Sequence, residues 1–282
     1  MFLTKHLTAG GPSWALDGCL LPPGFSLARL LQLPQADMAD WLQAFPREGA
    51  ASGTLLPPIE QGHEVWAAGV TYVRSREARE SESSASDVYT KVYTAARPEL
   101  FFKALGRRVV GHRMPIRVRG DSRWNVPEPE LTLVVSARGE IAGFCAGNDV
   151  SSRDIEGENP LYLPQAKVYE GSCALGPGIV LGGPDNFRDF DVRCEVLRGG
   201  RPVFADTTST SQMKRTFEDL ANYLFKELDF PIGVFLMTGT GIVPPPDFSL
   251  APGDTVRITI GPLVLENLVD DSPRRSSAGV HP

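Results

Sequence analysis

Hydrophobic and polar residues alternate with a period of two through much of this chain, a pattern typical of β-strands. Residues 131–135 and 141–145 flank a turn at 138–139, and this arrangement predicts a β-hairpin. The same alternation returns at 192–196 and at 256–260. The chain is therefore expected to be built mainly of antiparallel strands.

Helical periodicity is confined to a few segments. Residues 209–228 carry apolar side chains at helical spacing after a Ser/Thr cluster suited to an N-cap, and this pattern predicts a core helix. Shorter helical patterns at 26–33 and 38–45 lie between Pro-rich breaks. The apolar run 65–72 predicts the first strand of the main domain.

These elements divide the chain into three parts. Its 282 residues exceed the ~100–200 residues of a typical domain. We expect a small N-terminal domain and linker over residues 1–62 and a catalytic domain over 63–270. The polar, aperiodic segment 271–282 is expected to be a disordered tail. The predicted fold class is α+β, mainly β.

Composition excludes several classes of protein. The net charge of −6 provides no basic field for nucleic acid, so no nucleic-acid partner is expected. No apolar run reaches the ~20 residues needed to cross a bilayer, and no membrane partner is expected either. The first residues show no apolar stretch of the signal-peptide kind. These features predict a cytoplasmic location.

Three carboxylates form a candidate metal site. Glu128 and Glu130 stand two residues apart at the start of a predicted strand, so they face the same side. The prolines beside them place this segment at a sheet edge, a bulge or a sheet end facing a cavity. Asp149 closes the next predicted strand. Three carboxylates suit Mg²⁺, Mn²⁺ or Ca²⁺ and do not suit zinc.

Lys167 lies further along the chain, in Pro164-Gln165-Ala166-Lys167. Close to a bound cation the pKa of its ammonium would fall, and the neutral amine would then serve as a general base.

The ordered motifs of residues 65–269 resemble the fumarylacetoacetate hydrolase family. The resemblance implies a β-roll of mixed sheets with few helices, which assembles as a homodimer or a higher homo-oligomer. It assigns Mg²⁺ or Mn²⁺ to Glu128, Glu130 and Asp149, makes Lys167 an active-site residue, and places Thr240 against the substrate carboxylate. The motifs are Glu128-x-Glu130, Gly147-Asn148-Asp149-Val150-Ser151-Ser152-Arg153-Asp154, Lys167 with Leu175-Gly176-Pro177, Met237-Thr238-Gly239-Thr240 and Leu250-Ala251-Pro252-Gly253-Asp254.

One departure from the family pattern narrows the expected reaction. The hydrolases of the family activate water with a histidine followed three residues later by a glutamate, whereas the alignment places Glu77 at the histidine position. A carboxylate of pKa about 4.3 is a poor substitute for an imidazole of pKa about 6.5 near neutral pH. Residues 152–178 instead resemble the 2-keto-3-deoxy-D-arabinonate and D-xylonate dehydratases of pentose catabolism.

That branch implies a small 2-keto acid substrate and a metal-stabilised enolate. In this hypothesis Lys167 removes the proton from C3, and Glu99 protonates the departing C4 hydroxyl. Arg74 and Ser75 are candidate substrate-binding residues. The charge-dense segment 74–87 is either a mobile lid or an ordinary surface loop.

Two other functional readings stay open on sequence alone. The first is a relative that uses the same metal chemistry, either as a C–C bond hydrolase of acylpyruvate type or as an oxaloacetate decarboxylase. The second is a non-catalytic metabolite-binding relative. Retention of three carboxylates and Lys167 disfavours the second, because an unfilled acidic cluster would destabilise the fold.

Overall fold

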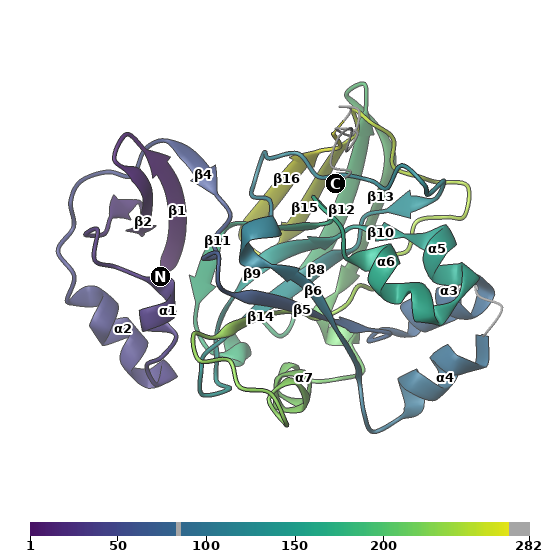
Figure 1. Ribbon diagram of the computed structural model, residues 1–282, viewed down its shortest axis with the longest axis horizontal. Helices are drawn as coiled ribbons and strands as arrows, with labels where there is room; N and C mark the ends of the chain where they lie inside the picture. Colours follow the sequence, from purple (N-terminus) through teal and green to yellow (C-terminus); the bar gives the residue numbers. More distant parts are fainter. Residues whose placement is uncertain (83–85, 271–282) are drawn as a thin grey trace, which may run out of the picture.

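The computed structural model of the chain describes residues 1–82 and 86–270, so the predicted disorder of 271–282 lies outside the described residues. Strands dominate the described part, where they form a ten-stranded sheet, a four-stranded sheet and a two-stranded pair. Figure 1 shows the large sheet in the middle of the molecule, with an N-terminal lobe on one side and a group of helices on the other. The predicted α+β class, mainly β with mixed sheets, is confirmed.

The large sheet carries the predicted hairpin at its centre. Its principal strands, in spatial order, are β11 (Cys173–Leu181), β9 (Ile141–Asp149), β8 (Pro129–Val135), β14 (Val234–Met237), β5 (Glu64–Gly69) and β6 (Glu99–Leu105). Every residue of β8 and β9 is buried, which explains the near-continuous apolar character of both strands. The β14–β5 pair is parallel and its neighbours are antiparallel, so the sheet is mixed.

The smaller sheet packs against β8, β9 and β11. Along its strand β12, Val192, Cys194 and Val196 are buried while the residues between them are more exposed. This is the alternation expected of a sheet with one face on the core and the other toward solvent. The sheet contains β13 (Arg201–Ser209), β12 (Asp191–Arg198), β15 (Thr255–Ile260) and β16 (Leu263–Leu268), and the separate pair contains β7 (Asn125–Val126) and β10 (Ser151–Ser152).

The N-terminal lobe continues the large sheet (Figure 1). Its strand β1 pairs antiparallel with β11 through Phe2 and Leu3. The division of the chain between residues 62 and 63 into two domains stays a prediction. The lobe contains β1 (Phe2–Thr8), β2 (Gly11–Leu16), β3 (Cys19–Leu20), α1 (Leu27–Leu30), α2 (Gln35–Gln43) and β4 (Thr54–Leu56).

Helices cover the ends of the sheets. A group of helices lies on the side of the molecule away from the N-terminal lobe (Figure 1), and the periodicity of the sequence did not predict it because its segments are short or dense in charge. The helices after the lobe are α3 (Val73–Glu82), α4 (Ser86–Thr94), α5 (Arg153–Glu158), α6 (Leu163–Lys167) and α7 (Phe217–Leu224), with 3-10 turns at Gly106–Arg108, Pro160–Tyr162, Pro184–Asn186 and Thr210–Gln212.

The predicted helix over 209–228 is too long. The Ser/Thr cluster ahead of it belongs to the end of β13 and to a 3-10 turn, because β-branched threonines fit the pleated strand. Helix α7 begins only after Thr216, whose side chain accepts a hydrogen bond from the N–H of Asp219.

Over residues 1–82 and 86–270, no helix combines the length and apolar character that crossing a membrane requires.

Phe144 offers a test of the packing that supports β9. Its side chain is 1% exposed, and its ring centre lies 4.8 Å from that of Phe187 and 5.3 Å from that of Phe190. We expect Phe144→Ala to lower the free energy of unfolding by ~3–5 kcal/mol through lost burial and a residual cavity. Urea titration measures this. Val264→Ala, on an exposed position of β16, is the control, and an equal loss in both variants would contradict the packing described.

Candidate active site

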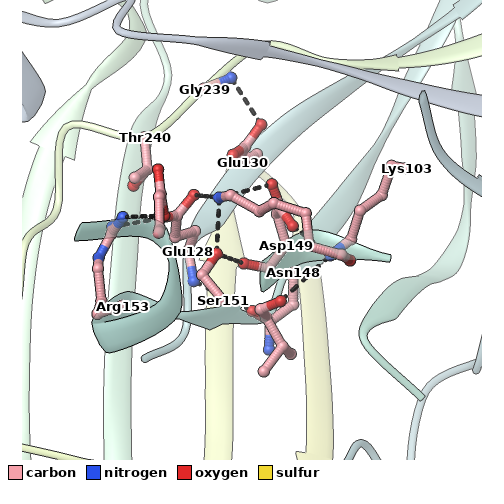
Figure 2. A network of polar contacts seen from close by, with 12 residues as sticks. Lys103, Glu128, Glu130, Asn148, Asp149, Ser151, Arg153, Gly239 and Thr240 are labelled. Carbon is pink, nitrogen blue, oxygen red and sulfur yellow. Dashed lines mark hydrogen bonds and ion pairs between the residues drawn. The ribbon is translucent and has the colours of Figure 1, made fainter. Parts of the chain in front are cut away.

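The turn between β8 and β9 folds the chain back so that the start of one strand lies beside the end of the other. Glu130 pairs with Gly147, and the N–H of Asp149 donates to the carbonyl of Glu128 at 2.9 Å. The two glutamates and Asp149 therefore meet, with one oxygen of each carboxylate within 4.8 Å of the others. Figure 2 shows the three carboxylates turned toward a shared space. Since β8 is a central strand, the predicted location at a sheet end facing a cavity holds and the predicted sheet edge does not.

Burial makes this cluster of carboxylates electrostatically costly. Glu128 and Glu130 are 4% and 2% exposed. Burial, together with the charges of Asp149 and Glu128, raises the pKa of Glu130 well above its ordinary value. The N–H of Gly239 donates to Glu130 Oε2 at 2.6 Å, a contact that Figure 2 shows, and holds this carboxylate in place.

Lys167 ends α6 and reaches into the cluster. Its Nζ donates to Glu128 Oε2 at 2.7 Å, to Asp149 Oδ2 at 3.1 Å and to Ser151 Oγ at 2.6 Å. Burial lowers the pKa of this ammonium, but Asp149 and Glu128 outweigh burial and raise the pKa above its ordinary value. Among these side chains the lysine is therefore charged, and the lowered pKa expected close to a bound cation stays a prediction.

Two arginines complete the neutralisation of Glu128. Arg79 from α3 donates to Glu128 Oε1 at 2.9 Å, and Arg153 from α5 contacts the same oxygen. Both arginines also pair with Glu156, at 3.2 Å and 2.8 Å. Arg153 lies inside the motif 147–154 and Arg79 inside the charge-dense segment 74–87, but nothing in their spacing indicated burial.

Glu99 lies on the same pocket as the metal cluster and Lys167. Its carboxyl leans over Gly69, where an added Cβ would lie only 2.1 Å from Glu99 Oε2. Burial and the charge of Glu156 raise the pKa of Glu99 to about 7, against the lowering effects of Lys167 and Arg79. Near neutral pH the carboxyl of Glu99 is thus protonated in about half of the molecules, which suits the predicted role of Glu99 as an acid.

The remaining predicted residues divide into two groups. Ser75 and Thr240 line the pocket. Arg74 does not line it; its guanidinium pairs with Asp206 at 2.6 Å on β13. Glu77 does not line it either, and its side chain is 60% exposed, so it is not placed to act as a base at this site. On α3, the side chains of Ser75 and Arg79 face the pocket instead.

The donor set fits a hard divalent cation. Three buried carboxylates present oxygen atoms only, which Mg²⁺ and Mn²⁺ prefer. Burial first, and the neighbouring carboxylates second, raise the pKa of Glu130, and a divalent cation would offset both effects. Glu128, Glu130 and Asp149 are the residues that would hold it.

Residues 64–270 match the family model described as fumarylacetoacetate (FAA) hydrolase C-terminal. The chain belongs to the fumarylacetoacetate hydrolase family.

Particular relatives fall on its dehydratase branch. The chain is 50% identical over 206 residues to the "Probable 2-keto-3-deoxyxylonate dehydratase" of Haloferax volcanii, a match that covers 72% of this chain and 70% of the relative. It is 45% identical over 202 residues to the 2-dehydro-3-deoxy-D-arabinonate dehydratase of Saccharolobus solfataricus, covering 70% and 68%. A solved 2-keto-3-deoxy-D-arabinonate dehydratase, complexed with magnesium and 2,5-dioxopentanoate, superposes with a TM-score of 0.81 at 33% identity over 96% of this chain and 99% of that one.

Gly239 tests the support of Glu130. Its φ is +89°, and an added Cβ would lie 2.1 Å from Thr71 Oγ1, so the loop that presents its N–H must shift in Gly239→Ala. We expect metal affinity, measured by calorimetric titration with Mn²⁺, to fall about tenfold or more. Gly253→Ala is the matched control, because Gly253 has φ +86° and open space around it. Equal affinities in the two variants would refute the role given to Gly239.

Proposed function

We propose that this chain is a Mg²⁺- or Mn²⁺-dependent dehydratase that converts a 2-keto-3-deoxy-pentonate to 2-oxoglutarate semialdehyde. The observation that carries the proposal is the pairing of a buried lysine with a carboxyl of pKa about 7 on one pocket beside a metal-type cluster. Elimination of water requires a base and an acid in this arrangement. The names of the two dehydratase relatives agree with this chemistry.

Lys167 and Glu99 divide the proton transfers between them. Lys167 is the proposed base for the C3 proton, and it can release its own proton once the surrounding carboxylates are neutralised by a divalent cation. Glu99 is the proposed acid that protonates the C4 hydroxyl as it leaves. Loss of the C3 proton and the C4 hydroxyl gives one water and an unsaturated keto acid, which rearranges to the aldehyde.

The other proposed residues bind and orient the substrate. When bound, the metal would polarise the 2-keto and carboxylate oxygens as a Lewis acid. Thr240 and Ser75, which both line the pocket, are the proposed partners of the substrate carboxylate and hydroxyls. Arg74 is already paired with Asp206, so its predicted substrate contact requires that ion pair to open.

Helix α3 has a proposed part in substrate entry. The cavity at the site has a volume of only about 20 Å³, enough for about one water molecule. A five-carbon acid therefore enters only if lining side chains move. The hydrogen bond from Arg79 to Glu128 joins α3 to the metal cluster. For the part of segment 74–87 that the structure describes, this contact supports the interpretation of the segment as a lid.

The histidines argue against water-activated hydrolysis. Of the histidines in the described residues, His6, His63 and His112, none lines the pocket. The acylpyruvate-type hydrolase is therefore the weaker alternative. Oxaloacetate decarboxylation needs no such histidine, but it leaves Glu99 without a leaving hydroxyl to protonate. A non-catalytic relative would have no use for a Glu99 of raised pKa beside Lys167.

A cytoplasmic location and assembly as a homodimer or higher homo-oligomer stay predictions. The family resemblance supports the second. The proposed partner is a small 2-keto acid, without nucleic acid or membrane.

A substrate panel tests the function. We expect the protein with Mg²⁺ to release 2-oxoglutarate semialdehyde from 2-keto-3-deoxy-D-arabinonate or D-xylonate, and Lys167→Met to lose both this activity and proton exchange at C3. Chromatography of the product and proton NMR in D₂O measure the two effects. The proposal fails if the wild-type protein instead cleaves acylpyruvates or releases CO₂ from oxaloacetate, or if calorimetry detects no Mg²⁺ or Mn²⁺ binding.

The pH profile tests Glu99. Because the acid must be protonated and its pKa in the free protein is about 7, kcat/KM should fall as the pH rises through about 7. In Glu99→Gln we expect kcat to drop by ~10²–10⁴-fold and this limb of the profile to vanish, while Mg²⁺ still binds. Glu77→Gln, at an exposed position of α3, should behave like the wild type. Full activity in Glu99→Gln would remove Glu99 from the scheme.

A further inference from the structure

Lys103 is a fully buried cation that the scheme above does not use. Its side chain is 0% exposed, and it is not among the residues that line the pocket. On β6 it follows Glu99 and Phe101 in an otherwise apolar strand. Burying an ammonium costs several kcal/mol unless oxygen atoms surround it. Specific contacts must therefore stabilise the buried charge of Lys103.

Lys103 lies at a β-bulge of β6, two residues after Phe101, which lines the pocket. Trp66 pairs with Phe102 and Val65 pairs with Ala104, which leaves Lys103 as the extra residue of β6. Because residues two apart along a strand face the same side, alternation from Glu99 and Phe101 directs Lys103 toward the site, and the bulge leaves it without a pairing residue on β5. Here the bulged residue lies two positions after Phe101, whose ring centre is 5.7 Å from Lys167 Nζ.

The contacts of Lys103 join the metal cluster to the proposed base. Its Nζ pairs with Asp149 Oδ1, donates to the carbonyl of Lys167 at 2.5 Å, and donates to the carbonyl of Val150 at 3.2 Å. The ammonium thus donates two hydrogen bonds to backbone carbonyls and forms an ion pair with Asp149 Oδ1, so oxygen atoms surround its charge. Figure 2 shows Lys103 reaching the cluster from the side of Asp149.

Asp149 is consequently held between two lysines. Lys103 contacts Oδ1, and Lys167 contacts Oδ2 at 3.1 Å. Because Lys103 also holds the backbone carbonyl of Lys167, the backbone of the base, its amine and the metal-ligating carboxylate form one closed ring of contacts. Moving any member of the ring changes the distance between the amine and the metal position.

We infer that Lys103 is a positioning residue that fixes the Asp149 carboxylate for the metal and the Lys167 backbone for proton transfer. It acts through these two residues and touches no substrate. Only the part concerning proton transfer rests on the proposed function; the part concerning the metal stands without it.

Lys103→Met tests both parts. The variant keeps the length of the side chain and removes its charge, and Asp149 retains Lys167 as a partner, so we expect it to fold. Groups that hold metal ligands in place contribute about 10–100-fold to metal affinity or activity. We expect Mn²⁺ affinity, measured by calorimetric titration, to fall by this factor. At saturating Mn²⁺ we expect kcat to fall while KM stays unchanged, because the substrate contacts are intact.

Lys5→Met is the matched control. Lys5 also donates to a backbone carbonyl, that of Ile59 at 2.7 Å, but it lies in the N-terminal lobe. A role in stability alone predicts a lower Tm in both variants with the metal affinity of both unchanged. Wild-type Mn²⁺ affinity in folded Lys103→Met would therefore overturn the inference.

A second variant and a second outcome keep the test decisive. If Lys103→Met does not fold, Lys103→Gln takes its place, because glutamine keeps an N–H donor for the carbonyls. Wild-type Mn²⁺ affinity in Lys103→Gln overturns the inference as well. If the wild-type protein shows no dehydratase activity but Lys103→Met still binds Mn²⁺ more weakly, the proposed function fails while the metal part of the inference stands.

Discussion

The structure depends on a balance of buried charge at the end of the β8–β9 hairpin. Glu128, Glu130 and Asp149 are almost completely removed from water, and such a cluster is unstable unless cations lie among the carboxylates. Cationic side chains from four segments contact Glu128 and Asp149: Lys103, Lys167, Arg79 and Arg153. The helices and the edge strand β6 are thereby fixed to the central hairpin by charge as well as by packing.

The positive charge is unevenly distributed over the three carboxylates, and this distribution favours the binding of a metal ion. Both oxygens of Glu128 contact cations, whereas the hydrogen bond that holds Glu130 comes from the neutral N–H of Gly239. The pKa of Glu130 is consequently raised well above its ordinary value, by burial first and by the neighbouring carboxylates second. A divalent cation at this point would add charge on the side of the cluster that the lysines and arginines leave uncompensated.

The same scaffold that supports hydrolysis elsewhere in the family here holds residues suited to elimination. Glu99 lies above Gly69 beside Lys167, and burial keeps a proton on half of its carboxyls near neutral pH. A hydrolase site must hold and deprotonate a water molecule, but a dehydratase must only remove one proton and supply another. The reaction class therefore depends on the side chains of the site and not on the fold alone.

The sequence by itself determined the strands, the hairpin and the carboxylates at its open end, because alternation and proximity along the chain are local properties. It also placed Lys167, Glu99, Ser75 and Thr240 among the site residues, and all four line the pocket. Tertiary structure alone decided the rest. It paired Arg74 with Asp206, left Glu77 in solvent, turned Arg79 inward and paired Lys103 with Asp149. The pairs of Arg74, Arg79 and Lys103 join residues far apart in the sequence, and the exposure of Glu77 depends on how α3 packs, and neither is encoded in local periodicity.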